Sequence, residues 1–122
     1  MKKPPFDKIV AVLVGLGVAG LVLLLAVEAA GVAGGAAIVV ALATLGGPLG
    51  MLGGLGLLAV LLLVAKGLSE YGFEALFRAV LRGLKKKGLS KQEILEKIAA
   101  YRISRSLKAK LKDYVDRYYD EL

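Results

Sequence analysis

The sequence predicts an all-α membrane protein, in which a helical hairpin with two transmembrane legs precedes two to three short amphipathic basic helices. Two observations carry this prediction. Of the 122 residues, 57% are hydrophobic and the mean hydropathy is +0.70, which exceeds the values typical of soluble domains. The charge is also uneven, because Glu28 is the single charged residue between Ile9 and Ala65, whereas the later chain is rich in Lys and Arg. We expect an N-terminal tail over residues 1–7, the hairpin over 8–66 and a helical module over 67–122.

The first leg is predicted to begin just after two prolines. Pro4 and Pro5 disfavour a helix before Phe6, and Asp7 suits a helix N-terminus. Residues 8–27 then form an apolar run of about 20 residues, enough to cross a hydrocarbon core of about 30 Å. The run exceeds the hydrophobic segment of about 7–15 residues found in cleaved signal peptides, so we expect it to stay in the chain. Glu28 is expected at the far interface.

The second leg is predicted to be broken. Residues 31–35 form a glycine-rich turn, and residues 36–65 would make a straight helix of about 45 Å, longer than the bilayer core. Gly46, Gly47 and Pro48 are the predicted hinge, because glycine and proline are poor helix formers. A complete break there would give three crossings. We favour two, because basic residues flank both ends of the apolar block, which places both termini in the cytoplasm of an integral membrane protein.

Small residues recur at four-residue spacing through the apolar block, a pattern that lets helix backbones approach closely. The predicted packing and oligomerisation positions are Gly15, Ala19, Ala33, Ala37, Gly46, Gly50 and Gly54. Two interpretations stay open: the legs pack within one chain, or several chains form a homo-oligomer. Over residues 8–66 the pattern resembles the hydrophobic hairpins of pore-forming toxins and the glycine-zipper membrane proteins. The resemblance implies an architecture and assigns no functional residue.

Beyond Lys66 the apolar residues recur at helical spacing. We expect a helix that begins at Ser69 and ends with Lys85–Lys87 before Gly88, a second that opens with a Ser90–Glu93 capping box, and a third that begins at Ser104. The amphipathic face of the first is formed by Phe73, Leu76, Phe77, Val80, Leu81 and Leu84. The three helices are expected to cluster or to lie on the membrane, with their apolar faces partly docked on the bilayer or on a neighbouring chain.

The charge of this module predicts an anionic partner. The net charge is +7, and residues 78–112 are rich in Lys and Arg, whereas residues 113–122 are mainly acidic. The predicted contacts with the anionic headgroups of a lipid bilayer are Arg78, Arg82, Lys85, Lys86 and Lys87. Nucleic acid is less favoured, because tyrosines accompany the basic residues without a recognition motif.

The chain has no Cys and no His, which excludes a disulfide, a Cys/His metal site, a thiol nucleophile and a histidine base. No glycine pattern matches a phosphate-binding loop, so we expect no enzyme, no cofactor and no small-molecule substrate. The first functional hypothesis is an anchor or scaffold that self-associates and presents its basic module at the inner membrane surface. The second is an oligomerising, pore-forming effector, and the third is a small transporter or channel subunit.

Overall fold

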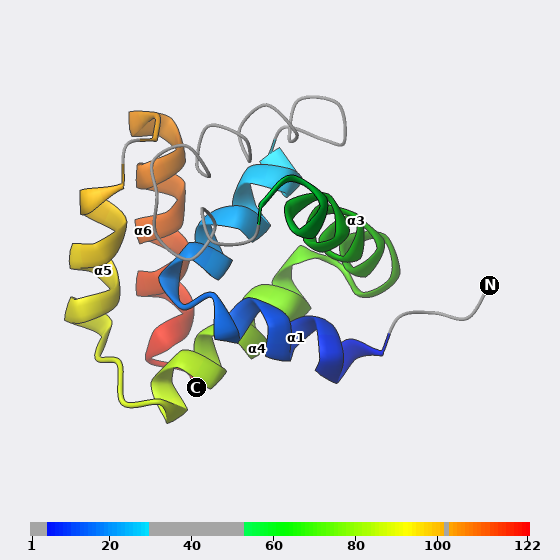
Figure 1. Ribbon diagram of the computed structural model, residues 1–122. Helices are drawn as coiled ribbons and strands as arrows, with labels where there is room; N and C mark the ends of the chain where they lie inside the picture. The colour runs from blue at the N-terminus through cyan, green and yellow to red at the C-terminus, as the bar shows by residue number, and fades with distance from the viewer. Residues whose placement is uncertain (1–4, 30–52, 102) are drawn as a thin grey trace.

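The computed structural model describes residues 5–29, 53–101 and 103–122 (Figure 1). These residues form helices joined by turns and contain no strand, which confirms the all-α prediction. The helices are α1 (Phe6–Gly15), α3 (Gly53–Tyr71), α4 (Phe73–Lys86), α5 (Lys91–Ala100) and α6 (Arg105–Tyr119), and residues 18–29 are also helical. The predicted boundary between residues 66 and 67 falls inside α3.

The predicted first transmembrane leg is interrupted in the middle of its apolar run. Gly17 has a φ of +70°, in the left-handed region that glycine tolerates, and its N–H donates to the Val14 carbonyl at 2.9 Å. The interruption leaves α1 only 10 residues long, whereas a bilayer core needs about 20.

Within the described residues, no helix combines the length and the apolar character that crossing a membrane requires. This finding overturns the predicted transmembrane hairpin, and with it the predicted integral membrane localisation with both termini in the cytoplasm. The predicted turn at 31–35 and the predicted hinge at Gly46, Gly47 and Pro48 lie outside the described residues.

The apolar segment 18–29 is buried inside the protein. Leu21, Val22, Leu23, Leu24 and Ala26 are each 0% exposed, so no side of the helix faces water there. A helix that is hydrophobic all round is suited equally to a membrane and to a protein core. In this fold the segment lies in the protein core. Glu28, at the end of the segment, is exposed.

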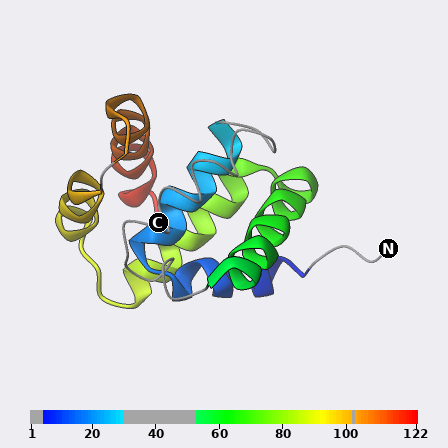
Figure 2. The same ribbon diagram turned by 45° about the horizontal axis from the view of Figure 1, so that its top comes forward.

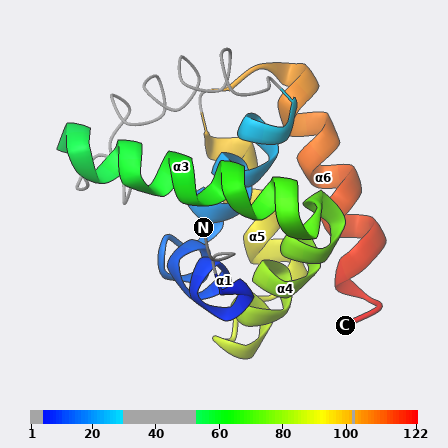
Figure 3. The ribbon, with the colours of Figure 1, turned by 90° about the vertical axis from the view of Figure 1, so that its right-hand side faces the viewer.

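Glycines bring α1 into close contact with α3 and α4. A Cβ placed on Gly67 of α3 would lie 2.9 Å from Ile9 Cδ1, and one on Gly83 of α4 would lie 2.5 Å from Val14 Cγ2. Larger residues at these positions would therefore push α1 away. Figure 3 faces α3, with α1 and α4 beside it.

The amphipathic face of α4 is covered within the chain. Leu76, Phe77, Val80, Leu81 and Leu84 are buried, Phe73 is partly buried, and α4 contacts both α1 and α6. The expected docking of this face on a bilayer or a second chain therefore does not apply. Figure 2 shows α3 on one side of α4, and α5 and α6 on the other.

The predicted helix boundaries are right in three places and wrong in one. Ser90 and Glu93 form the predicted capping box, the Ser104 side chain accepts the Leu107 N–H, and Lys85–Lys87 end α4. Ser69 is not a cap, because α3 continues to Tyr71. The break comes instead at Gly72, whose φ of +86° separates α3 from α4.

Candidate anion-binding site

The basic residues predicted to contact lipid lie along α4 and at its C-terminal end. Arg82, Lys85, Lys86 and Lys87 are exposed, and Arg78 is half-buried. Gly88, with a φ of +94°, turns the chain into α5. We call the set Arg78, Arg82, Lys85, Lys86, Lys87 and Lys91 the α4 corner.

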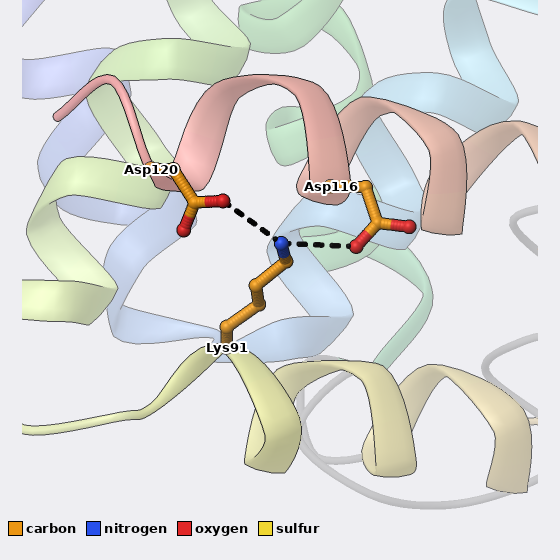
Figure 4. A network of polar contacts seen from close by, with 3 residues as sticks. All are labelled: Lys91, Asp116 and Asp120. Carbon is orange, nitrogen blue, oxygen red and sulfur yellow. Dashed lines mark hydrogen bonds and ion pairs between the residues drawn. The ribbon is translucent and has the colours of Figure 1, made fainter.

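The last turn of α6 and the two residues that follow the helix place carboxylates against this corner. We call Asp116, Asp120 and Glu121 the acidic end of α6. Lys91 Nζ lies 3.1 Å from Asp116 Oδ1 and 3.1 Å from Asp120 Oδ2 (Figure 4). The hydrogen bond to Asp120 is the largest cause that raises the pKa of Lys91 above its usual value, and the hydrogen bond to Asp116 is the second.

Arg78 and Lys85 are held by the same part of the chain. Arg78 Nη2 lies 3.2 Å from Glu121 Oε2 and 3.0 Å from Glu74 Oε1 on its own helix. Lys85 Nζ donates to the Leu122 carbonyl at 3.3 Å. Three cations of the α4 corner therefore already have partners among residues 116–122.

Aromatic rings fill the contact between α4 and α6. Phe73 lies 5.0 Å from Tyr114 and Phe77 lies 5.6 Å from Tyr114, between ring centroids. The Arg78 guanidinium lies 4.5 Å from the centroid of Tyr118, within the range of a cation–π interaction. The Tyr119 hydroxyl donates to the Leu89 carbonyl at 2.8 Å. Tyr118 is buried and Tyr114 and Tyr119 are partly buried, so all three side chains take part in packing within the protein.

Further cations lie between the last turn of α5 and the middle of α6. They belong to the basic stretch 78–112, but none of them was among the predicted lipid contacts. We call these cations the hairpin end: Lys97, Arg105, Lys108, Lys110 and Lys112. All are exposed except Lys108, which is partly buried and donates from Nζ to the Ala99 carbonyl at 2.8 Å. Lys108 thus satisfies a carbonyl in the last turn of α5.

No acidic residue lies between Lys97 and Lys112 in the sequence. Among the side chains that the structure describes, no carboxylate pairs with a cation of the hairpin end. Tyr101 lies in the turn between the helices, where burial raises the pKa of its hydroxyl. The absence of acids over this stretch was the signal that sequence analysis could have used.

The charges of α6 run against its helix dipole. A helix favours acidic residues at its N-terminus and basic residues at its C-terminus, and α4 follows that rule with Glu74 in its first turn and Lys85 and Lys86 in its last. In α6 the N-terminal half is basic and the C-terminal half is mainly acidic. The α4 corner compensates the acidic end with cations, whereas no described carboxylate pairs with a cation of the hairpin end. Such a departure from a local rule is expected where a residue serves function.

The predicted packing positions are scattered in the structure. Gly15 is exposed and open, with no atom within 4 Å of a Cβ built on it, whereas Ala19 is buried and Gly54 lies in the first turn of α3. Ala33, Ala37, Gly46 and Gly50 lie outside the described residues. Among the glycines whose surroundings the structure describes, close contacts with neighbouring atoms occur at Gly20, Gly67 and Gly83.

Comparison with known protein families, with curated proteins and with solved structures finds no match to this chain. Within residues 5–29, 53–101 and 103–122, no group of three or more acidic, His or Cys side chains could hold a metal ion. The arrangement of charge on α4, α5 and α6 is therefore the basis for a functional proposal.

Proposed function

We propose that this protein is a binding module for anionic lipid surfaces, without a catalytic role, and that the hairpin end makes the first contact. One observation carries the proposal: the hairpin end holds five cations on two helices that contact each other, with no acidic residue between Lys97 and Lys112 in the sequence. Each Lys or Arg close to an anionic membrane adds about 1 kcal/mol of binding free energy. Several such residues together suffice for reversible binding.

The chemistry of the cations favours lipid headgroups over nucleic acid. Most of the hairpin end is lysine, a compact charge on a flexible stem that suits a fluid array of phosphates and carboxylates. Proteins that bind single-stranded nucleic acid add exposed aromatic rings for base stacking. Here Tyr118 is buried, and Tyr114 stacks on it with 5.9 Å between centroids, so these rings are not offered to a base.

The proposal is tested by sedimentation with vesicles of phosphatidylcholine alone or with phosphatidylserine. We expect binding only to the second kind, falling as salt rises. Replacing Arg105→Gln and Lys112→Gln together, two exposed cations on one face of α6, is expected to weaken binding by about 25-fold, since two cations contribute about 2 kcal/mol. Lys108 is left intact because it also contacts the end of α5.

The matched control is Lys8→Gln with Lys66→Gln, which removes the same charge from exposed positions on α1 and α3. It is expected to weaken binding by less than about 3-fold, because charges outside the contact act only through screened long-range attraction. An equal loss in both variants would contradict a localised site. Stronger binding to duplex DNA than to vesicles at the same salt would contradict the lipid assignment.

Two parts of the sequence-based hypotheses are not carried into this proposal. The pore-forming and transporter hypotheses need a spanning helix, and the described residues contain none. Self-association stays a prediction, because most of its positions lie outside the described residues. Gly15 is one of the predicted self-association positions; it is exposed on α1, and a Cβ built on it has no atom within 4 Å.

A further inference from the structure

We propose that the α4 corner is a second surface for anionic lipid, and that the acidic end of α6 occupies it in the free protein as an internal competitor. This inference rests on the proposed function, because it concerns how the same protein meets the same kind of membrane. It identifies a second contact and the element that regulates it.

The α4 corner has the composition of an anion-binding surface. Between Arg78 and Lys91 the sequence holds six basic residues and no acidic one, a denser set than at the hairpin end. Arg82 and Lys86 are exposed, and no described residue forms an ion pair with either. Left alone, this corner would be the stronger of the two surfaces.

The acidic end of α6 neutralises part of that corner by direct contact. Its carboxylates lie 3.1 Å from Lys91 and 3.2 Å from Arg78. The Lys85 ammonium is drawn to the same region, 4.8 Å from the ring centroid of Tyr119. The carboxylates contact the cations that headgroup phosphates would contact, so a membrane and the acidic end compete for them.

The antiparallel arrangement of α5 and α6 places the acidic end beside the α4 corner. Lys91 at the start of α5 contacts Asp120 at the end of α6, whereas Lys108 near the start of α6 contacts Ala99 near the end of α5. The two helices are therefore antiparallel, and the hairpin end and the α4 corner lie at opposite ends of the pair (Figure 1). The opposite charges of α6 are thus separated, and each surface can be changed without altering the other.

The contacts of the acidic end can be exchanged without unfolding α6. The side chains of Asp116, Asp120 and Glu121 are 61%, 73% and 56% exposed, and exposed ion pairs are weak and screened by salt. The docking of α6 depends instead on buried Leu107, Leu111 and Val115. Headgroups can thus replace the carboxylates while the helix stays in place.

The test compares two variants in which two carboxylates are replaced by amides, so that the net charge of each rises by two. Asp116→Asn with Asp120→Asn frees Lys91, whereas Asp7→Asn with Glu28→Gln changes exposed acids that belong neither to the acidic end nor to the helices of the hairpin end. We expect the first pair to bind phosphatidylserine vesicles about 5-fold more tightly than the wild type, the contribution of one freed cation. The second pair should differ from the wild type by less than about 2-fold.

A third variant localises the effect. Adding Lys91→Gln to Asp116→Asn and Asp120→Asn is expected to return the affinity to that of the wild type, because the freed cation is removed. Circular dichroism and thermal unfolding check each variant for folding. If the double variant does not fold, Glu121→Gln is compared with Glu28→Gln, two variants that each remove one negative charge from an exposed position.

The outcomes separate this inference from the function on which it rests. If wild-type protein does not bind phosphatidylserine vesicles, the proposed function fails. If the wild type binds and Arg105→Gln with Lys112→Gln weakens binding, but the acidic-end variants gain no more than their controls, the internal competitor is refuted and the proposed function stands. A gain in binding to duplex DNA larger than the gain with vesicles would also overturn the inference.

Discussion

Residues 18–29 and α4 are both rich in leucine, yet the chain surrounds them differently. In the first segment every residue from Val18 to Val27 is buried, so its contribution to stability comes from packing on all sides. In α4 one face is buried, and Glu74 and Arg82 on the other face are exposed. The comparison shows that the spacing of apolar residues along α4 indicates which face of the helix is buried. Residues 18–27 are apolar on every side, and such a helix can be buried either in a protein core or in a bilayer.

The strongest test of this comparison removes one buried side chain from the segment that is packed all round. Leu24 is 0% exposed, and Leu24→Ala is expected to lower the free energy of unfolding by about 2–5 kcal/mol, through lost burial and the cavity left behind. Leu62 of α3 is 60% exposed, so Leu62→Ala should change it by less than about 0.5 kcal/mol. Urea denaturation measures both, and equal losses would contradict the burial of residues 18–29.

The same comparison explains which parts of the fold the sequence predicts. For α4, α5 and α6, the apolar spacing and the Ser90 and Ser104 caps predict the helices and their buried faces, because these signals are local. Ser69 misleads, because an equally good polar residue can lie within a helix that continues. The sequence does not mark the break at Gly17 either, because Gly15, Gly17 and Gly20 look alike and have different roles. Gly17 forms the turn, Gly15 faces open space and Gly20 lies in close contact with Leu13.

The candidate site is predictable to a similar degree. The run Lys85–Lys87 identifies the basic end of α4, and the acidic character of residues 113–122 is plain from the sequence. Consecutive helices with a short connection are usually antiparallel, but the rotation and register of α5 against α6 are set by packing, so the contact of Lys91 with Asp116 and Asp120 could not be predicted. The hairpin end was missed because its cations are spread over two helices and form no continuous run.

A second test uses two glycines that look alike in the sequence. A Cβ on Gly20 would overlap the carbonyl group of Leu13, which is backbone and cannot rotate away, whereas a Cβ on Gly15 meets open space. Gly20→Ala is therefore expected to destabilise the protein by about 1–3 kcal/mol. Gly15→Ala should stabilise it by about 0.5–1 kcal/mol, because alanine has the higher helix propensity. If thermal unfolding shows the same sign for both, the contact between α1 and residues 18–29 is not as described.

The smallest expected effect concerns the polar contacts of the amphipathic region. The pKa of Lys91 is raised in the folded protein, so its contribution to stability is fully present below the pKa of the unfolded chain, near 10.4. It is lost as pH rises through the higher folded value. Because the carboxylates of Asp116 and Asp120 are exposed, the effect is small. We expect the difference in unfolding free energy between the wild type and Asp116→Asn with Asp120→Asn to shrink between about pH 9 and 12.

Taking the difference between these two proteins isolates Lys91 from the other groups that titrate in this range. Tyr101 also has a raised pKa, because burial favours its neutral form, and its contribution is likewise lost at high pH in both proteins. If the difference in unfolding free energy between the two proteins stays constant from about pH 9 to 12, the pKa of Lys91 is the same in the folded and the unfolded chain. The acidic end would then be held to α4 by the contact of Glu121 with Arg78 and by the ring contacts of Tyr118 and Tyr119. Asp116 and Asp120 would in that case compete little with a membrane for Lys91.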